Sequence, residues 1–456
     1  MKRHVLIGIF GPQDNARVPT ATDEQVTHVP LVIGQKSLNF GIHRALQDLK
    51  AIGVFPSEIG VDLLVLAAHV HAADTRICRT TESQDSWTRE IRLVVPVSDH
   101  QRWTASSHLL ARILNFLTGD KWSIGFRPRP AGFAQTVPPR PLIGPNVPFD
   151  GLNLFSGGLD SLIGAIDTLE SGGGPLLVSH AGEGAVSDSQ NNCFNALRKH
   201  YSKYPFNRLR YWVNFPTSLV RGVSSEDSMR GRSFLFFALG IFAATGIGHQ
   251  PFVLKVPENG LIALNVPLDI VRLGSHSTRT THPFYMARWN ELLSRLGIAG
   301  TVENPYWNKT KGEMVSACTN KTLLKRIVPF SLSCSSPTKG RWAGRGTEHC
   351  GYCLPCIIRR ASLETAFGRG KDPTAYAIKD LASRPLNTLR AEGQQIRSLQ
   401  IAIERLRRTP TLAKILIHKS GSLSDQVDNL DELAAVYQRG MLEVAKSLTG
   451  TKTRPS

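Results

Sequence analysis

A glycine-rich turn between a predicted strand and a predicted helix carries the residue types best suited to chemistry. Residues 152–155 are mostly apolar and predict a buried strand, and residues 156–161 then read Ser-Gly-Gly-Leu-Asp-Ser, where a helical pattern begins. Such a turn presents backbone N–H groups and the positive end of a helix to an anion, and its glycines let the anion come close. The turn is therefore a candidate phosphate-binding loop, and an ordinary strand-to-helix turn with small residues is the alternative.

Four of the seven cysteines lie in one short span with the spacing C-x15-C-x2-C-x2-C, namely Cys334, Cys350, Cys353 and Cys356. Four thiolates at this spacing suit tetrahedral zinc, and a site filled by four sulfurs is closed and therefore structural rather than catalytic. Buried free cysteines or a disulfide pair are the alternatives, but no secretory signal indicates an oxidising compartment. Cys78, Cys193 and Cys318 are scattered and are expected to be plain core residues.

The length of 456 residues predicts two or three domains, and a hydrophobic fraction of 41% with a charged fraction of 20% is typical of a soluble globular chain. No run of 18 apolar residues predicts a membrane span, so we expect a cytoplasmic protein.

The net charge is +18, and most of the excess lies between residues 151 and 371, where 25 Lys and Arg face 14 Asp and Glu. Such a balance favours a nucleic acid, a polyanionic substrate such as ATP, or an acidic partner. Because no long basic tract with interleaved aromatic residues occurs, nucleic acid is the weaker of these interpretations.

Residues 1–127 read as one α/β or α+β domain, with strands expected over 5–10, 61–68 and 91–97 and helices over 43–49 and 106–117. His69, His71 and Asp74 resemble metal ligands, but surface residues at the end of a strand are the better interpretation. Residues 128–149 contain seven prolines, which exclude a helix and favour an extended linker.

Strand and helix patterns alternate from residue 150 to about 371, which predicts a parallel sheet with helices on both faces. Ligands of such sheets lie beyond the carboxyl ends of the strands. Ser156, His180 and the run Glu258-Asn259-Gly260 are all expected at such ends. Residues 372–456 read as a helical C-terminal region, with 399–406 and 430–448 as its clearest segments.

The two motifs together resemble a known family. The order Ser-Gly-Gly-x-Asp-Ser resembles the pyrophosphate-binding loop of the PP-loop ATP pyrophosphatases, and no Gly-Lys-Ser/Thr of the Walker loop occurs. Followed by cysteines that end in C-G-x-C-x2-C, it resembles 7-cyano-7-deazaguanine synthase. Residues 230–235, 310–315 and 331–334 resemble further motifs of that family in the same order, and Arg359 follows the last cysteine as expected, so the likeness covers roughly residues 151–367.

Several features depart from the biosynthetic synthase, which is shorter and has its loop near the amino terminus. Ser233 replaces the usual Asn, and the first two cysteines are farther apart. Residues 258–260, 264–268 and 277–283 do not look like the synthase. Together with the added N-terminal domain, they resemble the synthase-like component of the four-gene Qat antiphage systems.

The resemblance implies an adenine nucleotide alpha hydrolase-like fold and ATP-dependent, AMP-forming activation of a 7-carboxy-7-deazaguanine-type carboxylate, followed by attack of ammonia or of a partner protein's amine. It implies ATP, Mg²⁺ and Zn²⁺ as cofactors and protein partners from the same operon. The residues expected to bind ATP are Ser156, Gly157, Gly158, Asp160, Ser161 and His180. Asp160, Arg232, Lys311 and His282 are expected to be catalytic, and Glu258, Asn259 and Arg279 are expected to bind the substrate.

Three alternatives remain open at this point. His282 and Arg279 lie in a hydroxyl-rich segment whose threonines could simply satisfy the backbone of a turn. Other PP-loop proteins modify tRNA, so modification of tRNA or DNA is a second enzymatic interpretation. A nucleotide-binding assembly or sensing module without turnover is the third.

Overall fold

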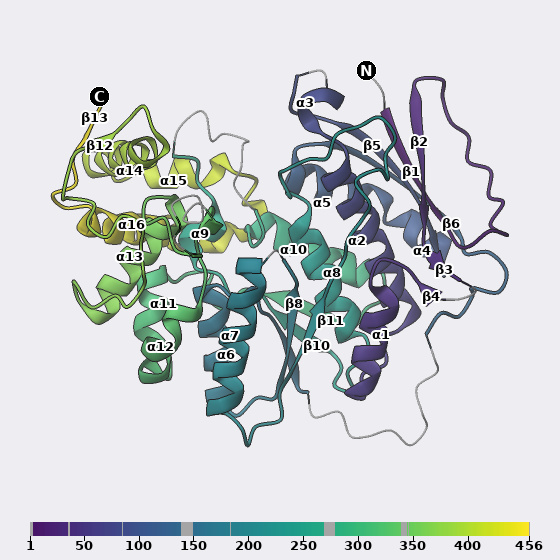
Figure 1. Ribbon diagram of the computed structural model, residues 1–456, viewed down its shortest axis with the longest axis horizontal. Coiled ribbons are helices and arrows are strands. Elements are labelled where there is room, and N and C mark those ends of the chain that lie inside the picture. The colour runs from purple at the N-terminus through teal and green to yellow at the C-terminus, as the bar shows by residue number, and fades with distance from the viewer. Residues whose placement is uncertain are drawn as a thin grey trace.

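The computed structural model describes residues 3–34, 37–83, 85–137, 149–182, 184–268, 279–338, 344 and 346–455. Two parallel sheets with their helices fill one side of the molecule, and a mostly helical C-terminal part fills the other (Figure 1). No helix among these residues is long and apolar enough to cross a membrane. Of the expected linker 128–149, residues 138–148 lie outside the described residues.

The N-terminal sheet has the strand order β2-β1-β5-β6, and all three of its strand pairs are parallel. Its strands are β1 (Arg3–Ile9), β2 (Glu24–Pro30), β5 (Glu90–Val97) and β6 (Lys121–Pro128). Parallel neighbours need crossover connections, and α4 (His100–Ala105) and α5 (Ser107–Thr118) join β5 to β6. The segment is therefore α/β, and the α+β interpretation is wrong. Its smaller elements are β3 (Val32–Ile33), β4 (Ser37–Leu38), α1 (Ile42–Ala51) and α3 (Arg79–Glu82).

The strand expected over 61–68 is wrong, because these residues belong to the helix α2 (Glu58–Arg76). Ser57 caps this helix by accepting a hydrogen bond from the Gly60 N–H at 3.3 Å. Sixteen of its 19 residues are buried, so the helix has no exposed polar face. Its sequence therefore lacks the periodicity that distinguishes a surface helix from a buried strand. His69, His71 and Asp74 are accordingly buried within a helix and are not surface residues at a strand end.

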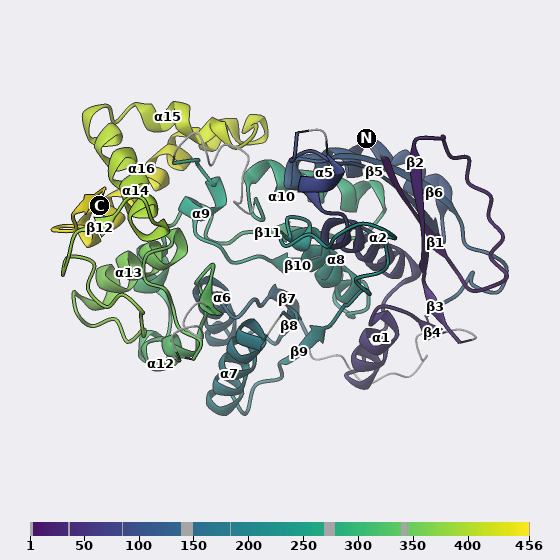
Figure 2. The same ribbon diagram turned by 45° about the horizontal axis from the view of Figure 1, so that its top comes forward.

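Helix α2 packs against α8 (Arg232–Ala244), a helix that covers one face of the second, five-stranded sheet (Figure 2). The approach is close, because a Cβ atom added at Gly60 would lie 2.5 Å from Thr245 Oγ1. Leu66 of α2 and Phe242 of α8 belong to one continuous hydrophobic core. The N-terminal segment and the second sheet therefore share their core.

The second sheet has the order β11-β10-β7-β8-β9, and every strand pair in it is parallel, as predicted. Its strands are β7 (Gly151–Leu154), β8 (Pro175–His180), β9 (Asn207–Tyr211), β10 (Phe252–Lys255) and β11 (Gly300–Glu303). One face packs in the core that contains α8 and α10 (Pro283–Arg295), and the other packs against α6 (Leu159–Glu170) and α7 (Gly184–His200). Helices on both faces confirm the predicted α/β class. The chain runs outward from β7 in both directions, so the strand order reverses between β7 and β10.

The C-terminal part is mainly helical, as predicted, and has a core of its own. The expected segments 399–406 and 430–448 fall in α14 (Ala391–Arg408) and α16 (Leu430–Ser447). The remaining helices are α9 (Gly260–Leu264), α11 (Lys311–Ala317), α12 (Lys321–Ile327), α13 (Leu354–Phe367) and α15 (Leu412–Leu416), with 3-10 turns over Val328–Phe330, Ile417–Lys419 and Ser424–Asn429. Strands β12 (Leu386–Asn387) and β13 (Thr453–Arg454) pair in parallel.

A first prediction follows from the core that the N-terminal segment and the second sheet share. Removal of residues 1–127 should yield aggregated protein, because it uncovers the apolar surface of α8 that α2 covers. Soluble yield and cooperativity of thermal unfolding, compared with those of the full chain, measure this. A soluble fragment that unfolds cooperatively would contradict it.

Candidate functional site

A cavity of about 520 Å³ opens beyond the carboxyl ends of β7 and β10. This is the point where the strand order reverses, which is the usual ligand site of an open parallel sheet. Of the predicted site residues, Ser156, Ser161, Arg232 and Glu258 line the cavity together. They come from three separate segments of the sequence, since Ser156 and Ser161 share the 156–161 loop.

The 156–161 loop connects β7 to α6 as predicted, and its shape depends on Gly157. This glycine has a φ of +81°, and a Cβ atom there would lie 2.9 Å from the backbone nitrogen of Gln190. Its carbonyl accepts hydrogen bonds from Ser189 Oγ at 2.7 Å and from the Leu332 N–H at 2.9 Å. Only glycine combines this backbone conformation with so close an approach of α7.

The loop ends at the N-terminus of α6, where Gly158 is the N-cap residue. Ser156 Oγ accepts a hydrogen bond from the Gly158 N–H at 3.3 Å and lies 3.2 Å from Ser161 Oγ. The first backbone N–H groups of a helix have no partner within the helix. Two hydroxyls and these N–H groups therefore form a small set of donors suited to phosphate oxygens.

Asp160 makes its contacts with two other segments of the chain and not with these donors. One of its oxygens pairs with Lys311 Nζ at 2.8 Å, and the other accepts hydrogen bonds from the side chain and backbone N–H of Asn259 at 2.8 and 3.2 Å. Asp160 and Lys311 are both buried. Lys311 thus neutralises Asp160, and neither side chain lines the cavity.

Asn259 was expected to bind the substrate, but the structure places it elsewhere. It is fully buried, and its side-chain oxygen caps α9 by accepting from the Ile262 N–H at 3.1 Å. Its side-chain and backbone N–H groups donate to Asp160, so these contacts position the 156–161 loop. Asn259 does not line the cavity.

Helix α11, which carries Lys311, is fixed from the C-terminal part. Thr310 and Glu313 form a reciprocal capping box at its start. Glu443 of α16 accepts hydrogen bonds from Thr310 Oγ1 and from the Gly312 N–H. Burial raises the pKa of the Glu443 carboxyl.

His180 ends β8 and supports Arg232. Its Nδ1 accepts a hydrogen bond from Arg232 Nε at 3.2 Å, and the His71 ring lies edge-on at 5.5 Å. Burial and then the charge of Arg232 lower the pKa of His180 well below its usual value, and the same two causes lower the pKa of His71 to about 4. Both imidazoles are therefore neutral, and they orient Arg232 without opposing its charge.

Glu258 is the acidic group of the cavity. Its carboxylate accepts a hydrogen bond from the Thr281 hydroxyl. Burial and the nearby Asp160 raise the pKa of Glu258 to about 7, although Thr281 and Lys311 act in the opposite direction. Glu258 can therefore gain or lose a proton near neutral pH.

Arg279 and His282 do not line the cavity. Arg279 donates to the Phe116 carbonyl at 2.8 Å and stacks on the Phe116 ring. His282 is the N-cap of α10, with Nδ1 accepting from the Phe284 N–H at 3.2 Å, and burial lowers its pKa to about 3. Both side chains thus have structural contacts, while Thr280 and Thr281 of the same segment do line the cavity. Residues 277–278 lie outside the described residues.

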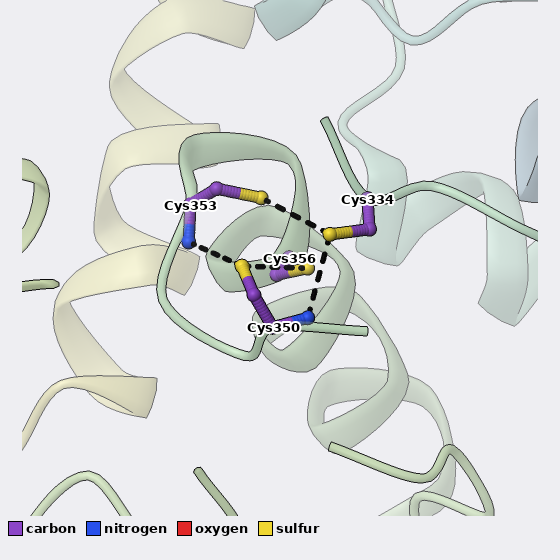
Figure 3. Close-up of side chains that lie close together, drawn as sticks. All are labelled: Cys334, Cys350, Cys353 and Cys356. Carbon is purple, nitrogen blue, oxygen red and sulfur yellow. Dashed lines mark hydrogen bonds between the residues drawn. The ribbon is translucent and has the colours of Figure 1, made fainter. Parts of the chain in front are cut away.

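The four cysteines meet as predicted (Figure 3). Their sulfurs all lie within 4.8 Å of one another, with Cys334 and Cys353 at 4.0 Å and Cys350 and Cys356 at 3.9 Å. These separations suit a tetrahedron of sulfurs around an ion at about 2.3 Å. The cluster can therefore hold a metal ion such as zinc.

Backbone donors surround this metal centre. The N–H groups of Ser336, Cys350 and Cys353 point at cysteine sulfurs at 3.3 to 3.4 Å, which favours the thiolate form. Gly351, with a φ of +86°, makes the turn between Cys350 and Cys353. Four sulfurs would leave an ion held here no open coordination position, which suits a structural site.

Two arginines that follow the cysteines on α13 bind the centre to its surroundings. Arg359 is fully buried and donates to the hydroxyls of Ser331 and Ser333 at 3.0 and 3.2 Å. Arg360 donates to the Gly351 carbonyl and stacks on Tyr376. Between the two serines lies Leu332, which lines the cavity, so the metal centre supports one wall of it.

Sequence reasoning missed two groups near the cavity. Arg230 lines it next to the recognised Arg232. Asp74, Arg79, Arg89 and Asp120 form a buried ionic network behind it. No local signal identifies the network, because its members lie on three separate segments of the chain. No protein-family model matches this sequence, and none of the curated proteins matches it significantly.

The metal centre makes a second prediction. Cys353→Ser should remove the metal and most of the soluble protein, because metal-binding free energy is coupled to folding. Metal analysis and soluble yield measure this, with Cys78→Ser, outside the cluster, as the control that keeps the metal. A well-folded, metal-free Cys353→Ser protein would show that the cluster needs no ion.

The raised pKa of Glu258 makes a third prediction. Because the folded state binds this proton more tightly than the unfolded chain, the Glu258 contribution to stability should fall as pH rises from about 4.5 to about 7. Glu258→Gln should abolish this part of the pH dependence and so become more stable relative to the parent with rising pH. Urea unfolding across the range measures it, with the exposed Glu303→Gln as control. Parallel curves for parent and Glu258→Gln would disprove it.

Proposed function

We propose that this chain is an ATP-dependent, AMP-forming ligase that activates a 7-carboxy-7-deazaguanine-type carboxylate. The observation that carries the proposal is the position of Ser156 and Ser161 at the reversal of the strand order, facing a cavity that also contains Arg232 and Glu258. Phosphate donors, a cation and a titratable carboxyl thus share one cavity. Its volume falls within the range of ordinary ligand sites.

In this proposal the 156–161 loop binds the β- and γ-phosphates. The hydroxyls of Ser156 and Ser161 and the N–H groups at the start of α6 would donate to phosphate oxygens. Mg²⁺, when bound, supplies further charge neutralisation on the phosphates. Asp160 and Lys311 have an indirect role in this proposal, because their ion pair fixes the loop against α11.

The chemistry consists of two substitutions. A carboxylate oxygen bonds to the α-phosphorus while the bond from that phosphorus to the bridging oxygen breaks, and pyrophosphate leaves. An amine nitrogen then bonds to the acyl carbon, AMP leaves, and the nitrogen loses a proton. Arg232 would stabilise charge near the α-phosphate. Glu258, with a pKa of about 7, suits the role of proton acceptor better than His282, which lies outside the cavity.

The amine is either ammonia or an amino group of a partner protein from the same antiphage operon. An acyl adenylate reacts with any well-placed amine, so both fit the proposed first step. Mass spectrometry of small-molecule products and of candidate partners, after incubation with ATP and 7-carboxy-7-deazaguanine, distinguishes them.

The net charge of +18 favours one second candidate, modification of tRNA or DNA. Binding of nucleic acid that weakens steeply with salt would support it. A nucleotide-binding module without turnover predicts ATP binding with no pyrophosphate release.

The fourth prediction tests the loop. Ser156→Ala should lower the rate of pyrophosphate release by about 100-fold, the typical effect of removing one donor to a developing oxyanion. Its fold should persist, because Ser156 is exposed at the cavity. Ser171→Ala, at the other end of α6, is the matched control. An unchanged rate in Ser156→Ala would refute the loop assignment.

Asp160 is a poorer target for the same test. Removing its carboxylate leaves the buried Lys311 without its ion-pair partner, and breaking a buried pair costs about 3–5 kcal/mol. Loss of activity in Asp160→Ala would thus accompany loss of stability.

A further inference from the structure

Arg230 is a cavity residue that belongs to none of the roles above. It lines the cavity two residues before Arg232. Its guanidinium lies 3.9 Å from the centre of the Trp87 ring, and Nη1 donates to the Thr118 carbonyl at 3.1 Å. Both contacts come from the N-terminal segment. Residues far from the 156–161 loop in the sequence therefore fix the position of the Arg230 side chain.

Most hydrogen-bonding capacity of Arg230 is unused within the described part of the chain. A guanidinium has five N–H donors, and the Thr118 carbonyl takes one of them. Nε is buried and has no hydrogen-bond partner among the described residues. Burial and the neighbouring Arg79 lower the pKa of Arg230 to about 10, which leaves it charged at neutral pH. A half-buried guanidinium that lines a cavity with most of its donors unused is suited to bind an acceptor there.

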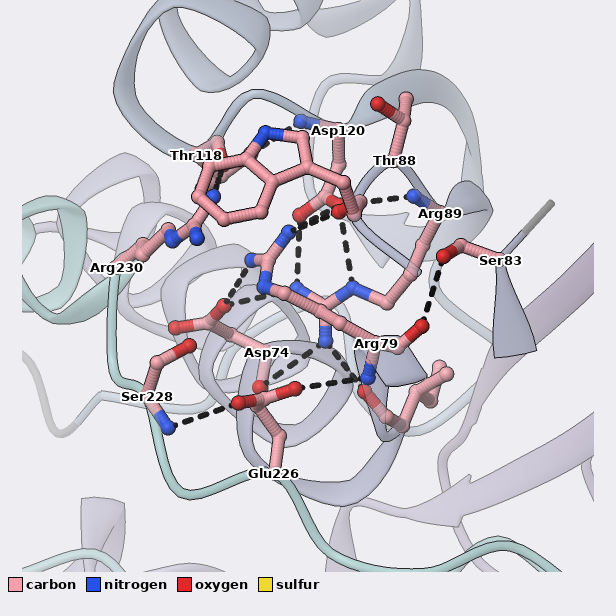
Figure 4. A network of polar contacts seen from close by, with 12 residues as sticks. Asp74, Arg79, Ser83, Thr88, Arg89, Thr118, Asp120, Glu226, Ser228 and Arg230 are labelled. Atoms are coloured by element: carbon pink, nitrogen blue, oxygen red, sulfur yellow. Dashed lines mark hydrogen bonds and ion pairs between the residues drawn. The ribbon is translucent and has the colours of Figure 1, made fainter. Parts of the chain in front are cut away.

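The ionic network of the N-terminal segment lies beside Arg230 (Figure 4). Arg79 and Arg89 each bridge Asp74 and Asp120, with nitrogen–oxygen distances of 2.5 to 3.2 Å. All four side chains are at most 4% exposed. Because each charge is paired with two of the opposite sign, the cluster forms a rigid base.

This network fixes the backbone on both sides of Arg230. On one side, Asp74 accepts a hydrogen bond from the Gly231 N–H at 2.6 Å. On the other, Glu226 accepts from the Arg79 N–H at 2.8 Å and from the Ser228 N–H at 2.9 Å. The segment 226–231 is therefore held against the N-terminal segment, while Ser228, Met229 and Arg230 line the cavity.

We infer that Arg230 is a second anion-binding residue of the cavity and that the buried network of Asp74, Arg79, Arg89 and Asp120 is the device that positions it. Its ligand is a carboxylate or phosphate oxygen, since the planar guanidinium fork matches both. Only the identity of the anion, as substrate carboxylate or ATP phosphate, rests on the proposed function. The N-terminal segment then contributes to the site itself.

The test measures binding of three separate probes to the full-length protein by calorimetry: inorganic pyrophosphate, MgATP and 7-carboxy-7-deazaguanine. Arg230→Met should raise the Kd of at least one probe about tenfold or more, and Arg230→Lys should recover part of the affinity. The affected probe identifies the source of the anion. Arg198→Met is the matched control, because Arg198 also stacks on an aromatic ring and donates to a carbonyl but does not line the cavity.

Positioning by the N-terminal segment is tested with Trp87. Trp87→Leu should weaken binding of the same probe as Arg230→Met, and Trp87→Phe, which keeps an aromatic face, should restore it. A merely structural role would instead lower the unfolding midpoint equally in both Trp87 variants without a selective change in Kd.

The outcomes separate the inference from the proposed function. If Arg230→Met binds all three probes as the parent does, the inference is wrong while the proposed function stands. If the parent binds pyrophosphate through Arg230 but neither ATP nor the carboxylate, the inference holds and the proposed function fails. If the parent binds no probe, both are wrong.

Discussion

The carboxylate of Asp160 is the contact on which the rest of the site depends. It is buried at the start of α6, and a buried charge requires an opposite charge and hydrogen bonds to be tolerated. Lys311 supplies the charge and Asn259 supplies the hydrogen bonds. One side chain therefore joins the 156–161 loop to α11 and to the turn after β10, and the loop cannot move without disturbing both.

Three outer parts of the chain hold segments that line the cavity or position its 156–161 loop. The N-terminal network holds the segment before α8, the metal centre holds Leu332 through Arg359, and Glu443 of α16 holds the start of α11. The Leu332 N–H also donates to the Gly157 carbonyl, so the support from the cysteine cluster extends to the 156–161 loop. The N-terminal segment, the cysteine cluster and the C-terminal helices thus all support the second sheet where the cavity opens.

The cavity combines neutral and charged groups. Ser156 and Ser161 offer hydroxyl groups, Arg230 and Arg232 offer positive charge, and Glu258 is a carboxyl group with a raised pKa. The neutral histidines behind Arg232 leave its charge available, because burial keeps them from becoming protonated.

The sequence by itself determined the features that depend on neighbours close along the chain. The 156–161 loop, the four cysteines and the alternation of strands and helices after residue 150 follow from local spacing, and the structure has all three. Tertiary structure decided the rest. Helix α2 was taken for a strand because burial on all sides removes the periodicity that marks a helix. Asn259 and Arg279 have hydrogen-bond partners on other segments, and the His282 ring lies against Phe116. The ionic network joins residues from 74 to 120 and holds Gly231, so only packing could assign these contacts. Local pattern fixes backbone shape, whereas the burial and partner of a polar side chain depend on which distant surface meets it.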